Sequence, residues 1–196
     1  MSTENPRIAD HPADKIFLER WSPRAFTGEA MPQTTLFTIL EAARWAPSSY
    51  NSQPWRFLYA VRDSAHWDKF LDLLIPFNQS WAKTGSAIIF AVSDTLMSVP
   101  GKDARVPSYS HSFDAGAAWG YLALQASILG WHAHGMVGIE FDRIRAELKV
   151  PEEFRIEAGI VLGKLGPKTL LPEALQAREF PSPRKPVSDF ALEGGF

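Results

Sequence analysis

The sequence predicts an α+β domain in which helices cover both faces of a central mixed sheet. Three observations favour this class. Helical and strand patterns are interspersed without a regular strand–helix–strand rhythm. Residues 86–93 form a continuous apolar run of strand length, which is typical of a central strand. Residues 115–131 are apolar nearly all round, as expected of a helix buried in the core.

The first quarter of the chain is expected to form two helices and a polar loop. A helix over 14–20 ends before Pro23, because residues preceding a proline disfavour helical backbone. In "PQTTLFTILEAARWA" apolar residues recur at helical spacing, and Pro47 ends this second helix. The loop 47–54 that follows is polar and is stiffened by a proline at each end.

The middle of the chain alternates between strand and helix patterns. The aromatic, alternating stretch "WRFLYAV" (55–61) predicts a strand, and residues 64–75 predict a short amphipathic helix. Residues 94–109 contain proline, glycine and charges, so we expect a mobile loop of the kind that covers a site. The long buried helix then spans about 112–130.

The last third is expected to add two strands, one helix and an extended arm. The stretch "WHAHGMVGI" predicts a strand that turns into a glycine-containing loop, and 142–150 predict an amphipathic helix. Residues 157–166 form another apolar strand. The tail 167–196 has five prolines and little periodicity, so we expect an extended C-terminal arm. No repeat or linker divides the 196 residues, which predicts a single domain.

Composition excludes several classes of function. The net charge is −2 and the basic residues are scattered, which disfavours binding to nucleic acid. The absence of cysteine excludes disulfides, thiolate nucleophiles and cysteine-ligated metals. The first residues lack the apolar segment of a signal peptide, and the apolar stretch is shorter than the roughly 20 residues of a membrane span. We therefore expect a cytoplasmic protein without membrane contact.

The stretch "RWSPRAF" concentrates polar donors just after the first predicted helix. If the chain there is extended, Arg20, Ser22 and Arg24 point the same way. Two guanidinium groups and a hydroxyl on one side can clamp a phosphate through charge-assisted hydrogen bonds. The alternative is two surface arginines in ordinary ion pairs.

Two later stretches have the composition of ligand-binding loops. "PSSYNSQPW" offers small amide and hydroxyl donors that suit a flat, acceptor-rich heterocycle, although a plain polar turn has the same composition. In "HGMVGIEFD" the glycines at 135 and 138 allow the backbone to approach a ligand closely. A simple strand-to-helix turn is the alternative there.

Other motifs carry weaker signals. His132 and His134 would face one side of a strand as metal ligands do, but no third ligand is implied nearby, so we expect no metal site. "GKLGPK" lacks the spacing of a phosphate-binding P-loop. No G-x-S-x-G motif is present, which disfavours a hydrolase.

Taken together, the motifs resemble those of the FMN-dependent nitroreductase family. The resemblance is carried by "RWSPRAF", by "AARWAPSSYNSQPWRF" and by Arg184 in the proline-rich tail, and it covers about residues 14–190. It implies the nitroreductase-like α+β fold. It also implies a homodimer that binds FMN at the subunit interface.

The resemblance further implies which residues bind the cofactor. The first motif holds the ribityl phosphate and the pyrimidine side of the flavin, and the C-terminal arginine assists at the phosphate. The loop after the second helix reaches the flavin from the other subunit, and the glycine loop lies beside flavin N5. The implied residues are Arg20, Trp21, Ser22, Arg24, Pro47, Ser48, Ser49, Asn51, Asn78, Gly135, Met136, Val137, Gly138, Arg184 and Lys185.

The implied activity is the NAD(P)H-dependent reduction of a small-molecule acceptor, such as a nitroaromatic or a quinone. Hydride would pass through flavin N5 in a ping-pong sequence, so no catalytic side chain is implied. The sequence does not choose between NADH and NADPH. Three alternatives stay open: a dehalogenase or dehydrogenase of the same fold, a flavin-binding carrier or sensor without fast turnover, and a structural dimer without cofactor.

Overall fold

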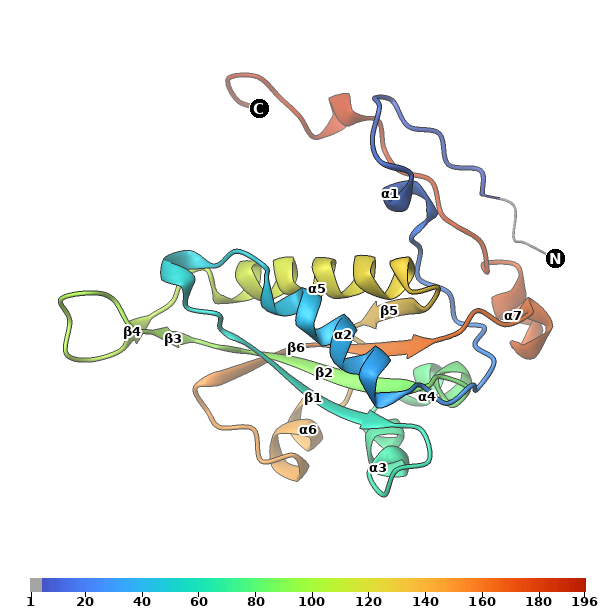
Figure 1. The fold of residues 1–196 in the computed structure, drawn as a ribbon, viewed down its shortest axis with the longest axis horizontal. Coiled ribbons are helices and arrows are strands. Elements are labelled where there is room, and N and C mark those ends of the chain that lie inside the picture. Colours follow the sequence, from blue (N-terminus) through green and yellow to red (C-terminus); the bar gives the residue numbers. More distant parts are fainter. Residues whose placement is uncertain (1–4) are drawn as a thin grey trace.

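A four-stranded antiparallel sheet forms the centre of the protein (Figure 1). The structure is a computed structural model that describes residues 5–196. The predicted α+β class is confirmed, but the expectation of a mixed sheet is wrong, because every pairing among the four strands is antiparallel. The connection from β1 to β2 leaves and re-enters the sheet at the same end of the strands, because Val61, the last residue of β1, pairs with Ala87, the first residue of β2. The strand order is β1 (Trp55–Val61), β2 (Ala87–Asp94), β6 (Phe154–Gly163) and β5 (His132–Met136).

Helices cover both faces of the sheet, as predicted. Figure 1 shows α2 and α5 over one face, and the core contacts place α3, α4 and α6 against the other. No helix within residues 5–196 has the length and apolar character that crossing a membrane requires. The helices are α1 (Lys15–Glu19), α2 (Gln33–Arg44), α3 (Trp67–Asp72), α4 (Pro76–Ala82), α5 (His111–Ile128), α6 (Phe141–Glu147) and α7 (Glu173–Gln176).

The two faces of the sheet bury different kinds of side chain. Because neighbouring residues of a strand point to opposite faces, Phe90 belongs to the core under α3, α4 and α6. There its ring lies 5.2 Å from that of Phe70. Ile89 and Ala91 face α5, which contributes mainly alanines to its own core. Small side chains let α5 lie close to the sheet.

The sequence does not predict α4. The predicted helix over 64–75 ends before Pro76, and no element is predicted for residues 76–85. Pro76 instead begins α4, because a proline at the first helical position loses no hydrogen bond and has a suitable φ. The helix predicted over 64–75 is correspondingly shorter, at Trp67–Asp72.

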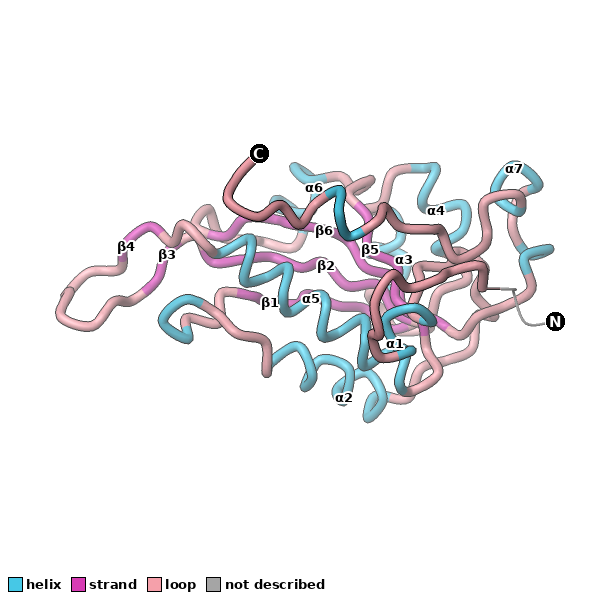
Figure 2. Tube along the Cα trace, turned by 90° about the horizontal axis from the view of Figure 1, so that it is seen from above, coloured by secondary structure: helices cyan, strands magenta, loops and turns pink. Residues whose placement is uncertain are grey.

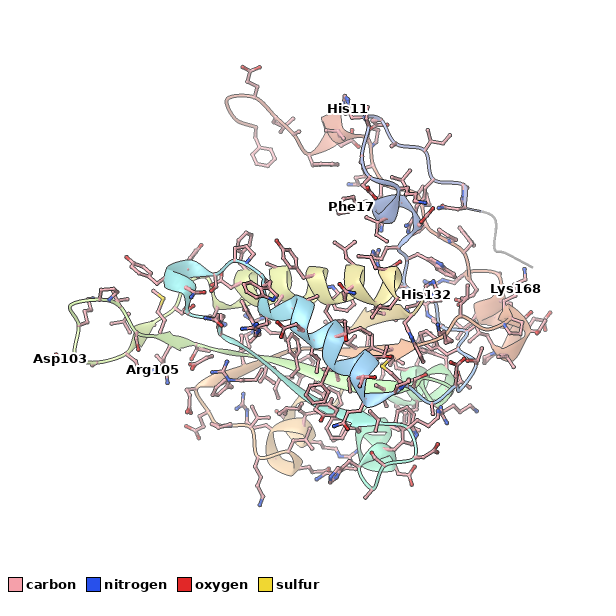
Figure 3. All side chains as sticks on the ribbon, in the orientation of Figure 1. His11, Phe17, Asp103, Arg105, His132 and Lys168 are labelled. Carbon is pink, nitrogen blue, oxygen red and sulfur yellow. The ribbon has the colours of Figure 1, made fainter. Side chains whose placement is uncertain are left out.

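Residues 94–109 form a small hairpin rather than the expected covering loop. The strands β3 (Leu96–Met97) and β4 (Val106–Pro107) pair antiparallel. Arg105 forms an ion pair with Asp94 and donates to the carbonyl of Leu96 at 2.7 Å, so the base of the hairpin is held. In Figure 3 Asp103 and Arg105 lie at the opposite end of the molecule from His132. The tip of the hairpin therefore lies away from the start of β5.

The two ends of the chain run together above α5 (Figures 1 and 2). Arg7 Nε donates to the carbonyl of Ser182 at 2.8 Å, and the N–H of Val187 donates to Asp10 at 2.9 Å. The extended arm predicted over 167–196 is confirmed beyond α7, where the tail contains only the short 3-10 helix η3 (Val187–Asp189). Its first part is instead helical, in the 3-10 helix η2 (Lys168–Leu170) and α7. At the N-terminal end, α1 contacts α5, and its Phe17 lines the same cavity as Gly116 and Trp119.

Candidate functional site

An arginine pocket of about 430 Å³ lies where residues 20–24 meet the C-terminal arm. We use this name for the pocket lined by five arginines together with Trp21, Ser22 and His134. Arg20 and Ser22 face it together, and the Arg20 guanidinium donates to the Ser22 hydroxyl at 3.3 Å. The first motif and the C-terminal arginine are thus brought together as predicted. The five arginines are Arg7, Arg20, Arg24, Arg178 and Arg184.

Positive charge dominates the arginine pocket. Burial, and then the neighbouring Arg184, lower the pKa of Arg20, while burial, Arg184 and Arg20 lower the pKa of Arg7. Burial is the larger cause in both cases, and repulsion between the arginines adds to it, so the charged guanidinium groups are partly desolvated and lack sufficient counter-charge. Such a cluster gains free energy when an anion enters, and paired guanidinium donors suit phosphate oxygens in particular.

One buried carboxylate, Glu179, organises the edge of the pocket. Its Oε1 accepts the backbone N–H groups of Arg24 at 2.6 Å and Ala25 at 2.8 Å. Its Oε2 lies 4.0 Å from the Arg24 guanidinium. Burial lowers the pKa of Arg24 more than Glu179 raises it. Glu179 therefore attaches the C-terminal arm to the first motif without neutralising the pocket.

A second, larger cavity of about 770 Å³ adjoins the pocket and shares Arg20 and Ser22 with it. We call it the apolar cleft. Small residues of α5 form one wall, with Gly116 open toward the cleft, where an added Cβ would meet nothing within 4 Å. Trp119 packs against Gly135, where a Cβ would come within 2.9 Å of the indole. The remaining lining comes from Phe17, Ala91, Ser112, Ala115, Gly120, Ala123, Leu124, Met136, Val137, Glu157, Ala158 and Ile160.

Asn78 holds the glycine loop, residues 135–138, which begins at the end of β5. The Asn78 amide donates to the Gly138 carbonyl at 2.9 Å and accepts from Trp81 Nε1 at 3.2 Å. A Cβ at Gly138 would lie 2.4 Å from the Asn78 amide nitrogen, so this contact requires glycine. Gly135, Met136 and Val137 line the cleft, whereas Asn78 and Gly138 line neither cavity. Asn78 as a direct cofactor contact stays a prediction.

Both histidines of β5 lie next to the arginine pocket in the neutral form. Burial lowers the pKa of His134 to about 4, and its Nδ1 lies 2.9 Å from the carbonyl oxygen of Pro23. Burial, with help from Lys164 and Arg20, lowers the pKa of His132 to about 4. Within the described residues no group of three potential ligands is arranged for a metal.

The second motif lies away from both cavities. The N–H of Ser49 donates to Asp114 at 3.2 Å, which attaches this loop to the first turn of α5. Tyr50 and Asn51 adopt left-handed backbone in the 3-10 helix η1 (Ser49–Asn51), with φ of 52° at each. Besides Asn78 and Gly138, the predicted residues that line neither cavity of their own chain are Pro47, Ser48, Ser49, Asn51 and Lys185.

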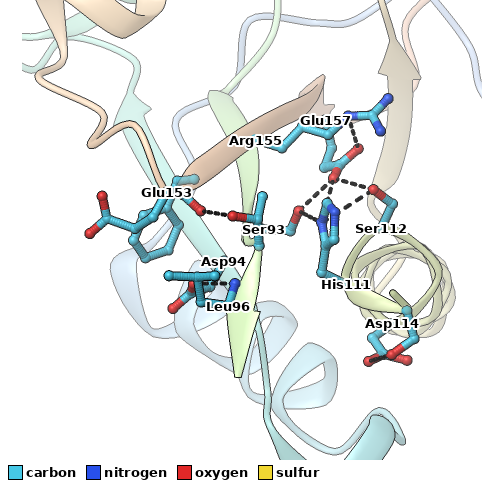
Figure 4. Close-up of polar contacts among 12 residues, drawn as sticks. Ser93, Asp94, Leu96, His111, Ser112, Asp114, Glu153, Arg155 and Glu157 are labelled. Carbon is cyan, nitrogen blue, oxygen red and sulfur yellow. Dashed lines mark hydrogen bonds and ion pairs between the residues drawn. The ribbon is translucent and has the colours of Figure 1, made fainter. Parts of the chain in front are cut away.

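Three residues that line the cavities are not predicted from the sequence. Arg7 lies in an aperiodic N-terminal segment, and Arg178 is a single charge in a proline-rich tail, so neither gives a local signal. Glu157 is the first residue of a stretch that predicts an apolar strand, but it lines the apolar cleft beside Ser112. Figure 4 shows its carboxylate among the side chains of Ser93, His111 and Ser112.

Comparison with known proteins agrees with this arrangement. The family model described as "Nitroreductase family" matches residues 18–80, which contain both N-terminal motifs. A crystal structure of an oxidoreductase containing FMN is 50% identical, covers 100% of this chain and 98% of that chain, and has a TM-score of 0.94.

More distant relatives extend the comparison. A protein from Desulfovibrio desulfuricans, crystallised in complex with FMN, is 26% identical over 96% of this chain and 99% of its own, with a TM-score of 0.72. An NADH dehydrogenase of Thermus thermophilus is 28% identical over 173 residues, which are 74% of this chain and 83% of that protein. With the matched motifs and fold, these similarities show that the chain belongs to the nitroreductase family of oxidoreductases.

Proposed function

We propose that the chain binds FMN, with the phosphate in the arginine pocket and the ring system in the apolar cleft. The observation that carries this proposal is that a strongly cationic pocket and a long apolar cleft share Arg20 and Ser22. A ligand that fits both needs a dianionic end and a flat apolar body, as FMN has. The two similar structures that contain FMN support the assignment.

In this proposal each group of residues has one task. Arg20, Ser22, Arg24 and Arg184 hold the phosphate, with Trp21 contributing backbone and Lys185 assisting from the arm. Arg7 and Arg178 add positive charge to the same pocket. The loop 135–138 borders the ring system, and Asn78 fixes its position through the Gly138 carbonyl. The neutral forms of His132 and His134 add no charge that would alter phosphate binding at pH 7.

We further propose a homodimer in which Pro47, Ser48, Ser49 and Asn51 of one subunit complete the site of the other. This is supported by the finding that none of these residues lines a cavity of its own chain. On α5, Phe113 is 82% exposed and Ile128 is 65% exposed, so apolar side chains of this helix are available to a second subunit. Sedimentation should show a dimer at micromolar concentration, and a monomer there would contradict the proposal.

The proposed reaction is NAD(P)H-dependent reduction of small acceptors such as nitroaromatics and quinones. FMN, when bound, supplies the hydride-transfer chemistry, and the protein supplies binding and orientation. Trp119 and β5 close one side of the cleft, while Gly116 and Gly120 leave space along α5. Donor and acceptor would use this open side in turn, which gives ping-pong kinetics. Arg20 keeps positive charge near the site and favours an anionic reduced state.

The visible absorption spectrum of the purified protein is the first test. We expect a flavin spectrum that NADH or NADPH bleaches under anaerobic conditions, and the faster donor identifies the preference. Steady-state turnover with menadione then separates an enzyme from a flavin carrier or sensor. A protein that stays colourless after incubation with FMN contradicts the site assignment. The single-domain organisation and cytoplasmic location stay predictions of the sequence.

A further inference from the structure

The apolar cleft ends in a charged group that the proposed cofactor site does not use. Ser112 lies in the first turn of α5 and Leu124 near its last, so the cleft follows the helix for roughly 18 Å at 1.5 Å per residue. Glu157 and Ser112 line it near the N-terminal end of α5. The rest of that end is formed by small apolar side chains, among them Ala91, Ala115 and Ala158.

Glu157 reaches the cleft because of a β-bulge. In the pairing of β2 with β6, Ala91 lies opposite Ala158 and Val92 lies opposite Ile156, so Glu157 has no partner. In a regular strand, adjacent residues point to opposite faces. Here Glu157 and Ala158 both line the cleft, while Ile156 belongs to the core on the other face. Bulges of this kind redirect side chains and occur preferentially beside active sites.

The carboxylate of Glu157 is held by three side chains (Figure 4). Its Oε1 accepts hydrogen bonds from the hydroxyls of Ser93 and Ser112, the latter at 2.7 Å. His111 Nδ1 lies 2.7 Å from the Ser93 hydroxyl and 3.6 Å from Oε1. Because the Ser93 hydroxyl already donates to Glu157, it accepts from His111. These contacts occupy Oε1 and fix the orientation of the whole group.

The other oxygen, Oε2, keeps acceptor capacity. Its nearest charged neighbour is Arg155, whose Nε lies 3.5 Å away. The Arg155 side chain is 64% exposed, so solvent screens this ion pair. An oriented carboxylate at the end of an apolar cleft, with one oxygen that accepts no hydrogen bond within the described residues, attracts a hydrogen-bond donor or a cation. It also repels a ligand carboxylate at hydrogen-bonding distance, which weakens the affinity for such a ligand several-fold or more.

We propose that Glu157 is a specificity-determining residue that selects aromatic acceptors carrying a hydroxyl, amino or ammonium group. This inference rests on the proposed function, because it treats the cleft as the place where the electron acceptor binds. Anionic aromatic acceptors are disfavoured by the same carboxylate. Ser93, Ser112 and His111 act as positioning residues that keep Oε2 available to the ligand.

The test compares two biphenyls that cannot be reduced, 4-(aminomethyl)biphenyl and biphenyl-4-carboxylate, on the protein as purified. Isothermal titration calorimetry gives the two dissociation constants for wild type, Glu157→Gln and the control Glu153→Gln. Glutamine keeps the shape and the acceptor oxygen of residue 157 but removes its charge. Glu153 is an exposed carboxylate four residues away that lines neither cavity.

We expect wild type and E153Q to bind the amine at least about tenfold more tightly than the carboxylate, and E157Q to bind the two within about threefold. Equal binding of both ligands by wild type overturns the proposal, whether or not E157Q folds. An unchanged preference in E157Q does the same.

The outcome is separable from that of the proposed function. Menadione turnover without the ligand preference leaves the oxidoreductase proposal intact and removes this one. If the protein binds no FMN, biphenyl-4-carboxylate can bind at Arg20, which lines the same cleft. In that case the loss of affinity for the amine in E157Q, compared with wild type and E153Q, decides the role of Glu157. The ratio of kcat/KM for 4-nitrobenzylamine and 4-nitrobenzoate should follow the same order in the FMN-loaded enzyme.

Discussion

The two faces of the central sheet differ in the size of the side chains that they bury. Under α3, α4 and α6 the core contains Trp67, Phe70, Trp81 and Phe90, and none of its buried residues lines either cavity. The face under α5 is built largely from alanines, and the apolar cleft opens there. Large side chains fill space and small ones leave it. Both faces bury apolar side chains, Trp55 and Trp131 among them under α5, but both cavities lie outside the core under α3, α4 and α6.

The strongest test of this division is Phe90→Ala. Phe90 is fully buried, so we expect a loss of about 3–5 kcal/mol in the free energy of unfolding, from lost burial and the cavity that remains. Denaturant unfolding measures it. Phe77→Ala removes a half-exposed ring from α4 and should cost far less. FMN affinity of the folded F90A protein should be unchanged, and a large drop would break the division.

Acidification should destabilise the protein through β5, whose His134 lies between the two regions. Its folded-state pKa of about 4 is below the ordinary value of 6.5, so the unfolded chain binds more protons between these values. The stability contribution is complete above pH 6.5 and is lost as pH falls toward 4.

The free energy of unfolding is expected to fall by the order of 3 kcal/mol through His134, and by a similar amount through His132. Unfolding curves between pH 7 and 4.5 measure it. His134→Gln should flatten the profile, whereas His66→Gln, at an exposed position, should not. A profile that keeps its slope in H134Q contradicts the assignment.

Arg20→Ala sharpens the comparison from the binding side. Charge-assisted hydrogen bonds contribute about 1.5–3 kcal/mol, so we expect FMN to bind about 10- to 150-fold more weakly and the variant to lose flavin during purification. Flavin content and fluorescence titration measure this. Arg44→Ala removes an exposed arginine on α2 as a control. If R20A purifies fully yellow, the arginine pocket is not the phosphate site.

Gly116→Ala should have the smallest effect on stability, and it tests whether the ring system of FMN reaches α5. An alanine in the middle of α5 favours the helix by about 0.5–1 kcal/mol, and its Cβ meets no neighbour. The same methyl group projects into the cleft. We therefore expect a slightly higher melting temperature for the cofactor-free protein together with weaker FMN binding. Unchanged FMN affinity would show that the ring does not reach this part of α5.

Local patterns account for what could be predicted from the sequence. The strand at 55–61 coincides with β1, since alternation and aromatic content are properties of the segment alone. The clamp at residues 20–24 was recognisable because its donors lie two apart in an extended chain. Pro76 shows the limit of such rules, because proline can end one helix or begin the next, and only the packing of Trp81 against the sheet decides.

Glu157 shows what the sequence could not reveal. Its direction depends on a bulge that exists only in the pairing of β6 with β2, and strand periodicity alone does not indicate which residue is left over. Arg7 is a similar case, because its place in the arginine pocket depends on contacts with the far end of the chain. Long-range pairing creates both features, and a single segment carries no trace of it.

The contact between Arg7 and Ser182 joins residues that are 175 positions apart. Because a ribosome releases the C-terminal arm last, the arginine pocket cannot be assembled until Arg184 has left the exit tunnel. The proposed phosphate site is therefore completed only at the end of biosynthesis. A chain that stops after β6 would contain every strand of the sheet but would lack Arg178 and Arg184, and we expect it to bind no FMN.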